Sequence, residues 1–199
     1  TDVPTLWGSR RAQLNKGQVA TVASMGHMTG EVPFPVVEWH PDSGSEFINW
    51  HCHDWCATQG IRLTRSRPNR KNDNCFVEER NGHIVRRWVG YTRLDAAEVV
   101  MALNAVYDVL TPYLNHFVAS RRIVSKERIG ARWKVTRETR SKTPYERVLE
   151  RNDVSTVMKT TLRQTHETLN PLTMKLEIDR RLQEVFILQK HHGMPNLVR

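Results

Sequence analysis

The first 90 residues alternate between short extended-type stretches and stretches of helical periodicity, and this alternation constrains the fold more than any other feature. Asn15 is expected to cap the first helix, while Gly60 and Gly90 are expected to end the next two. This order of elements predicts an α/β fold, in which helices cover a sheet. We expect strands over 1–14, 33–40 and 61–66, and helices over 16–29, 45–59 and from Asp73 or Asn74 to about 89.

A long helix is expected over 95–117, where apolar residues recur every three or four positions, with a kink or break at Pro112. Short β pieces follow within 120–151, and "TPYE" at 143–146 predicts a helix that opens with a capping box. Two further helices are expected over 153–168 and 171–192. These boundaries divide the chain into three regions, 1–117, 118–151 and a helical region 152–199.

Positive charge is concentrated in two segments of a chain whose formal net charge is +9. Residues 120–151 hold eleven Lys/Arg against four Glu, and residues 62–71 hold five basic residues and no acid. Such clustering is typical of a phosphate-binding surface and predicts an anionic partner. A pair of solvated basic faces would give the same composition, and this alternative stays open.

The sequence indicates neither a membrane span nor a disulfide framework. No apolar run approaches the roughly 20 residues that cross a bilayer, and the chain opens without a signal-peptide pattern. Three cysteines in 199 residues favour a reducing compartment. We therefore expect a cytoplasmic protein without a membrane partner.

The stretch "HPDSGSEFINWHCHDWC", residues 40–56, offers two different chemistries. Its His51-Cys52-His53 run with Cys56 resembles part of a zinc site, which needs about four converging ligands. Cys52 and Cys56 lie four residues apart on one face of the expected helix, however, and no second Cys/His pair lies at a suitable distance. We therefore expect both thiols to pack in the core as small apolar side chains, and no zinc to be bound.

Asp42 offers the other chemistry, since it ends an apolar strand and precedes the small residues Ser43-Gly44-Ser45. Carboxylates at strand ends of α/β sheets lie where such folds build active sites. Glu78 follows after 35 intervening residues, enough for a helix, a strand and a loop that bring its own helix back over the strand end. The two carboxylates could hold a hard cation, although a turn aspartate and a solvated glutamate are the ordinary interpretation of each residue alone.

Three motifs extend this pattern: "DSGSEFIN" from Asp42, "TRSRPNRKNDNCFVEERN" ending at Asn81, and "VRRWVGYTRLD". Together they resemble the catalytic core of insertion-sequence transposases and retroviral-type integrases, the DDE superfamily. The later pieces "SKERIG", "KTPYERVL" and "LNPLTMKLEID" are similar to the downstream part of one bacterial transposase-like group, so the resemblance covers most of the chain. It implies an RNase H-like core, then a basic β-containing segment and a helical tail.

The resemblance also implies roles for individual residues. Asp42 matches the second catalytic acid and Glu78 the third, so both are expected to bind Mg²⁺ or Mn²⁺. DNA contacts are expected before the catalytic helix, one turn after Glu78, and in the downstream basic segment, from Arg65, Arg67, Arg70, Lys71, Asn81, Arg132 and Lys134. Trp133 either stacks on a base or packs in a small β piece.

The chain departs from the family pattern in two ways. Ser43 replaces the usual asparagine, and both residue types can hydrogen-bond the turn. The family's first catalytic aspartate lies on the first strand of the fold, yet Asp2 is the only acid before Glu31 and matches a later strand better. We therefore expect that strand and its aspartate to be missing, which would leave strand edges open and favour self-association.

The resulting hypothesis is DNA transposition or integration by metal-dependent strand cleavage and strand transfer, in a bacterial, nucleoid-associated homo-oligomer. The alternative is a non-catalytic DNA-binding remnant or truncated regulatory product, which the missing aspartate favours. A zinc-dependent nucleic-acid module built on Cys52 and Cys56 is a third hypothesis.

Overall fold

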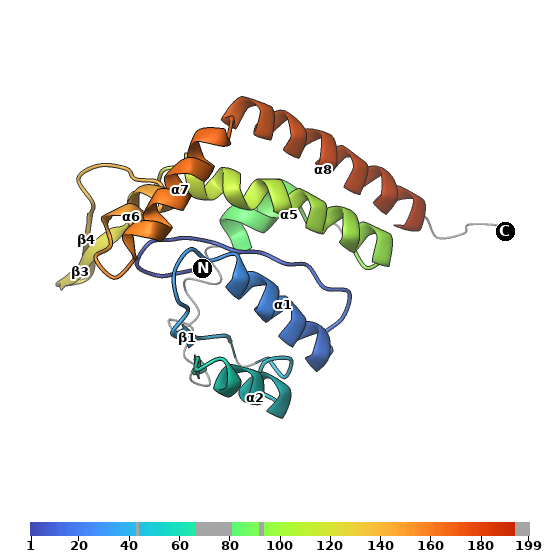
Figure 1. Ribbon diagram of the computed structural model, residues 1–199, viewed down its shortest axis with the longest axis horizontal. Helices are drawn as coiled ribbons and strands as arrows, with labels where there is room; N and C mark the ends of the chain where they lie inside the picture. Colours follow the sequence, from blue (N-terminus) through green and yellow to red (C-terminus); the bar gives the residue numbers. More distant parts are fainter. Residues whose placement is uncertain (43, 67–80, 92–93, 194–199) are drawn as a thin grey trace.

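The computed structural model describes residues 1–42, 44–66, 81–91 and 94–193 and contains both helices and strands (Figure 1). Its elements are α1 (Gln18–Gly30), β1 (Glu38–Trp39), α2 (Trp50–Thr58), β2 (Arg62–Leu63), the π-helix η2 (Asn81–Arg86), α4 (Arg87–Val89), α5 (Ala97–Phe117), β3 (Ile123–Ile129), β4 (Arg132–Arg137), α6 (Pro144–Glu150), α7 (Thr156–Thr168) and α8 (Pro171–Gly193). In the described ranges β1 pairs with β2 in parallel, and β3 pairs with β4 antiparallel. The predicted mixture of helices and strands is confirmed.

The largest core lies between helices α5 and α8, which run side by side (Figure 1). The three- and four-residue spacing predicted for α5 produces one buried face, and α8 covers it. The buried residues of this pair include Val99, Leu103, Val106, Leu110, Ile178, Leu182 and Val185. The helical region expected over 152–199 therefore shares its core with the region 1–117.

The sequence predicts a kink or a break at Pro112, and the break does not occur, because α5 continues through Pro112. A proline lacks the N–H that would bond to the carbonyl four residues earlier. That carbonyl belongs to Asp108, an exposed residue, so water can reach it. Leu110 and Leu114 pack in the α5–α8 core on both sides of the proline and hold the helix together there.

The first 14 residues form no strand, and this expectation is also wrong. The Gly8 N–H donates to Asn115 Oδ1 at 2.9 Å, and Asn115 Nδ2 donates back to the Gly8 carbonyl at 2.8 Å. Asn104 makes the same pair of bonds with the backbone of Ala12, at 2.8 and 3.1 Å. Because the two asparagines lie about three helical turns apart, both face this segment from one side of α5 and satisfy backbone groups that a neighbouring strand would otherwise pair.

A smaller layer contains β1, β2, α1 and α2 (Figure 1). Its core consists of Met25 from α1, Cys52 and Cys56 from α2, and Ile61, the residue before β2. The strands β1 and β2 lie within the expected strand ranges 33–40 and 61–66, although each is only two residues long. This layer places the carboxyl ends of both strands at one edge.

Local capping sets the helix ends of this layer. Helix α2 begins at Trp50, later than expected, because the Asn49 side chain caps it. Gly60 follows its end with φ +67°, as expected, in the left-handed region that glycine enters without strain. The expected Asn15 cap of α1 is wrong: Gly17 holds the cap position, and the Asn15 side chain accepts the Gly17 N–H instead.

The hairpin β3–β4, called the ribbon below, projects from one end of the molecule beside α6 (Figure 1). Helix α6 opens with the expected capping box, in which Thr143 and Glu146 bond each other's backbone and Pro144 is the first helical residue. Helices α7 and α8 confirm the two helices expected after the basic segment. Within the described ranges, no helix has both the length and the apolar composition needed to cross a bilayer.

Candidate functional site

Asp42 lies just past the carboxyl end of β1, and Arg65 lies just past the carboxyl end of β2. Because the strands are parallel, these ends meet at one edge, where the Ser66 N–H bonds to the Pro41 carbonyl at 3.3 Å. Asp42 is half-buried, and its Oδ1 accepts the Gly44 N–H at 3.0 Å. The structure thus brings two of the residues predicted from the sequence to the same edge, called the strand-end site below.

A chain of polar contacts that the sequence analysis missed links the two strands at this edge. Thr64 Oγ1 donates to Glu38 Oε1 at 2.7 Å, so in the 2.7 Å contact between Thr64 Oγ1 and His40 Nδ1 the imidazole is the donor. His40 Nε2 can then accept from Ser66 Oγ at 3.4 Å. The pKa of the Glu38 carboxyl is lowered, mainly by the hydrogen bond from Thr64 and next by the one from Arg62.

The signal for this network was the two-residue strand period combined with the parallel register. In an extended chain residue 40, just past β1, faces the same side as residue 38, and residue 64, just past β2, faces the same side as residue 62. Glu38 lies opposite Arg62. Sequence periodicity supplies the faces but not the register, so the partners could not be assigned without the structure.

A pocket of about 650 Å³ opens at the strand-end site. Its wall combines both strand ends with α1 and the start of α2, and includes Gln18, Pro41, Trp50, His53, Thr64 and Arg65. Trp50 is 79% exposed, whereas the cysteines of the same helix are buried. The pocket therefore joins an accessible aromatic ring to Arg65, and Pro41, the residue before Asp42, forms part of its wall.

Four residues predicted to act at this site lie outside the described residues: Arg67, Arg70, Lys71 and Glu78. Asn81, predicted to approach DNA, is the first residue of η2. Single π-helical turns are rare and occur frequently at functional sites. The pairing of Asp42 with Glu78 stays a prediction.

Asp2, which was considered as the missing first acid, is already engaged in local contacts. Its carboxylate accepts the Thr5 N–H at 2.9 Å and lies 3.5 Å from the Arg151 guanidinium. Asp2 therefore closes the N-terminal turn onto the residue that follows α6.

Cys52 and Cys56 confirm the predicted core packing. Both thiols are buried, and burial raises the pKa of each. Cys52 Sγ contacts the Glu46 carbonyl at 3.4 Å, while His51 and His53 lie on the exposed side of α2. The two chemistries of the 40–56 stretch are thus separated, with thiols inside and Asp42 at the sheet edge.

Arg132 and Lys134, the DNA contacts predicted downstream, lie on one face of β4, since both point to the same side of the ribbon. Trp133 lies on the other face, where the Lys126 ammonium sits 4.9 Å from its ring centre. All residues of β4 are exposed, and Trp133 is 56% exposed. In the part of the chain that the structure describes, neither Arg132 nor Lys134 forms an ion pair, so both charges are available to an anion.

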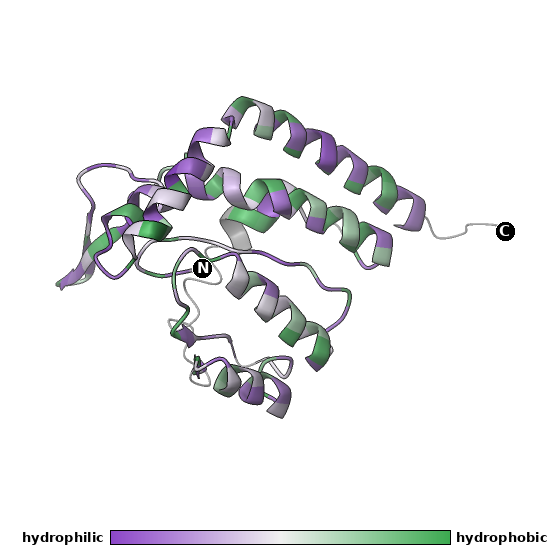
Figure 2. Cartoon of the chain, viewed as in Figure 1, coloured by the Kyte–Doolittle hydropathy of each residue, from purple (hydrophilic) through white to green (hydrophobic). Residues whose placement is uncertain are grey.

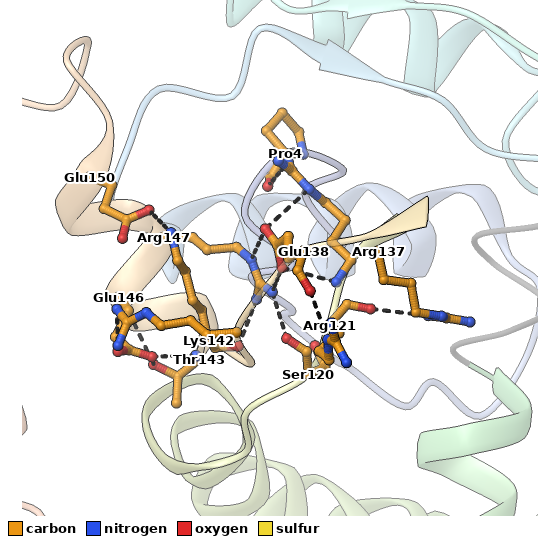
Figure 3. A network of polar contacts seen from close by, with 12 residues as sticks. Pro4, Ser120, Arg121, Arg137, Glu138, Lys142, Thr143, Glu146, Arg147 and Glu150 are labelled. Atoms are coloured by element: carbon orange, nitrogen blue, oxygen red, sulfur yellow. Dashed lines mark hydrogen bonds and ion pairs between the residues drawn. The ribbon is translucent and has the colours of Figure 1, made fainter. Parts of the chain in front are cut away.

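The ribbon is fastened to α6 by one buried arginine (Figure 3). The Arg147 guanidinium bonds the Glu138 carboxylate after β4, the Ser120 carbonyl before β3 at 2.7 Å, and the Lys142 carbonyl at 2.8 Å. Glu138 also accepts the Arg122 N–H at 2.9 Å. These contacts lower the pKa of Glu138 to about 2, and the hydrogen bond from Arg147 has the largest effect. Both ends of the ribbon therefore meet at one ion pair.

A cluster of aromatic rings joins the N-terminal segment to α5, α6 and α7. His116 Nδ1 lies 3.1 Å from His166 Nδ1, and the His166 ring stacks on Tyr145 with centres 4.2 Å apart. Trp7 contacts His116 edge to face, at 5.6 Å between centres. Burial, followed by the neighbouring His166, lowers the pKa of His116 to about 4. The neutral form of His116 is therefore part of the packed structure.

Three further groups of metal-ligand type converge where α1 approaches α5. Ligand atoms of His27, Glu31 and Asp108 lie within 4.8 Å of one another. His27 is already 3.1 Å from Glu31, and Arg11 lies 3.7 Å from Asp108. Because Arg11 brings a positive charge, this group is best described as an ion-pair network between two helices.

No protein-family model matches the chain. It is similar to a protein of Sinorhizobium fredii (strain NBRC 101917 / NGR234), the uncharacterized protein y4rM, with 41% identity over 132 residues. The match covers 66% of this chain and 38% of that protein. The chain therefore spans well under half of the relative's length.

Proposed function

We propose that the chain acts in metal-dependent DNA strand cleavage and strand transfer, as the catalytic core of a DDE-type transposase or integrase with an RNase H-like fold. The observation that carries this proposal is the meeting of Asp42 and Arg65 at the carboxyl edge of a parallel strand pair. Ligands of open α/β sheets bind at this edge. The motif that resembles the family's third-acid block starts at the same edge, with Thr64, and contains Glu78.

Mg²⁺ or Mn²⁺ would be held by Asp42 together with Glu78. Asp42 fits this role because its carboxylate is only half-buried and because, in the described ranges, its single hydrogen bond is the one to the Gly44 N–H through Oδ1. Carboxylate and phosphate oxygens are the ligands that such hard cations prefer. When bound, the ion activates a water or a DNA 3′-hydroxyl and stabilises the leaving oxygen.

The remaining roles belong to positive side chains that bind phosphate. Arg65 would hold a backbone phosphate near Asp42, because it is exposed, lies at the same sheet edge and lines the pocket there. Arg132 and Lys134 would hold a more distant stretch of DNA on the ribbon. Phosphate contacts position the DNA without reading its sequence.

The test is DNA nicking and strand transfer in Mn²⁺, comparing the wild-type chain with Asp42→Asn and Glu78→Gln. Each substitution keeps the size of the side chain but removes the charge that binds the metal, so both should reduce cleavage to background. Asp54→Asn, on the exposed side of α2, is the matched control and should cut as the wild type does. Equal cleavage by all four proteins would overturn the carboxylate site.

The ribbon favours a second function, non-catalytic DNA binding, because its basic residues are exposed independently of any acid at the strand-end site. DNA binding that falls with salt, with no cutting by the wild type in either metal, would support this function over strand transfer. Strand transfer must hold two DNA ends, so the first function also requires a homo-oligomer. Light scattering with and without DNA measures this directly.

A further inference from the structure

Trp50 is the most exposed tryptophan of the described residues, and helix formation does not account for its position. Asn49 supplies the cap of α2, and the buried side of the helix is occupied by Cys52 and Cys56. The indole of Trp50 instead borders the pocket at the strand-end site, where His53, one turn later, contacts it edge to face at 6.0 Å. A large ring held at the mouth of a pocket offers a flat apolar surface to a ligand.

The pocket wall has the composition of a site for a planar, polar-edged group beside a negative charge. Phe47, Ile48 and Leu63 supply apolar surface, while Gln18 and Thr64 supply amide and hydroxyl groups. Arg65 supplies the positive charge. Its volume of about 650 Å³ lies within the range of small-ligand pockets, roughly 300–1,000 Å³.

We propose that this pocket takes one unpaired base of the DNA strand, stacked on Trp50, while Arg65 holds an adjoining phosphate. The proposal rests on the proposed function and deepens it, because it states the form of DNA that the strand-end site accepts. A base inside a duplex has both faces covered by its neighbours and cannot stack on a side chain, so the accepted strand must be frayed or single-stranded next to Asp42. Base stacking on an aromatic side chain contributes about 1–3 kcal/mol and tolerates any base.

The experiment uses the full chain and two oligonucleotides, a paired duplex and the same duplex with a single-stranded end that carries 2-aminopurine. Fluorescence anisotropy measures the affinity for each, and quenching of 2-aminopurine reports stacking. Wild type and Trp50→Phe should quench the probe, whereas Trp50→Ala should lose the quenching. The affinity of Trp50→Ala for the single-stranded end should fall about 5- to 150-fold, which corresponds to the loss of one stacked base. Its affinity for the paired duplex should not change.

Tyr91→Ala removes an equally exposed aromatic ring outside the pocket wall and is the matched control. It should quench and bind as the wild type does, and a thermal melt of each variant should confirm that the fold is intact. Unchanged quenching in Trp50→Ala, with DNA still bound, would overturn the stacking proposal and leave the proposed function standing. Failure of the wild type to bind either oligonucleotide would overturn both.

Discussion

The α5–α8 helix pair and the β3–β4 ribbon use their apolar residues in opposite ways. In the helix pair Val106, Leu110 and Ile178 have no exposed surface, and α8 carries hydrophilic residues over much of its length (Figure 2). In the ribbon Ile129 is 61% exposed and Trp133 is 56% exposed, and the other face of β4 is exposed as well.

This difference separates residues that the fold explains from residues that it does not. A two-stranded hairpin is only marginally stable in water by itself, so the ribbon depends on its attachment at the base. Its exposed apolar and basic side chains contribute little to that attachment, which comes from Arg147 and Glu138. The composition of the ribbon is therefore not explained by folding alone, and the proposed contact with DNA would account for it.

Among the substitutions that test this comparison, Arg147→Ala should cause the largest loss in the free energy of unfolding. Removing one partner of a buried ion pair costs about 3–5 kcal/mol, and here Glu138 and the carbonyls of Ser120 and Lys142 would also lose their donor. Urea denaturation measures the loss. Arg140→Ala, which breaks an exposed pair with Glu146, is the control and should cost about 0–1 kcal/mol. Similar small losses in both would show that the ribbon is attached in some other way.

A matched pair of apolar truncations tests the two regions directly. Leu110→Ala removes a fully buried side chain between α5 and α8 and should cost about 2–5 kcal/mol in the free energy of unfolding. Val135→Ala removes an exposed side chain of the ribbon and should cost no more than about 0.5 kcal/mol. A loss at Val135 close to that at Leu110 would mean that the ribbon is packed in solution, and self-association would be the first explanation to examine.

Local sequence signals gave correct predictions for several features that depend only on nearby residues. The "TPYE" capping box, the left-handed Gly60 and the buried Cys52–Cys56 face all appear as expected. The three- and four-residue spacing likewise predicted the buried face of α5. Each of these features depends on neighbours within about four residues.

The Asn15 cap is a local prediction that failed, but the larger failures are long-range. The segment 1–14 looks like a strand because it is extended, but its partners are side chains of Asn104 and Asn115, about 100 residues away. The neighbouring sequence does not distinguish an asparagine whose side chain bonds an extended backbone, as a strand would, from an asparagine on the solvated face of a helix. The same limit applied to the site, where Asp42 could be proposed from its own turn, while the His40–Thr64 contact required the register of two strands.

Acid should weaken the aromatic cluster that links α5 to α6 and α7. The buried His116 ring is held neutral with a pKa of about 4, facing His166 and Tyr145, whereas unfolding restores an ordinary histidine. The unfolded chain therefore binds the proton first, and stability should fall as the pH drops from about 6.5 to about 4, by an amount on the order of 2–3 kcal/mol.

Denaturation midpoints of the wild type and His116→Phe across this range measure the effect. Phenylalanine keeps a stacked ring but does not titrate, so the variant should show a flatter profile above pH 4.5. Below that pH both proteins should lose stability together. The pKa of Glu138 is about 2 in the folded state and 4.5 without its folded contacts, so the unfolded chain binds this proton at a higher pH than the folded chain does. If the stability of both proteins changed in parallel across the whole pH range, the loss between about pH 6.5 and 4.5 would have to come from a group other than His116.

The smallest effect on stability, and the largest on DNA, should come from the double substitution Arg132→Ala and Lys134→Ala. Both side chains are exposed and without ion pairs in the described ranges, so the free energy of unfolding should change by less than about 0.5 kcal/mol. If both contact phosphates, the slope of log affinity against log salt should fall by about 1 for each removed charge. Arg180→Ala, which removes one charge from α8 where Arg180 pairs with Glu177, should leave that slope unchanged. A double variant that loses stability but keeps its salt slope would reverse the assignment, and the ribbon would then belong with the helix pair as part of the folded core.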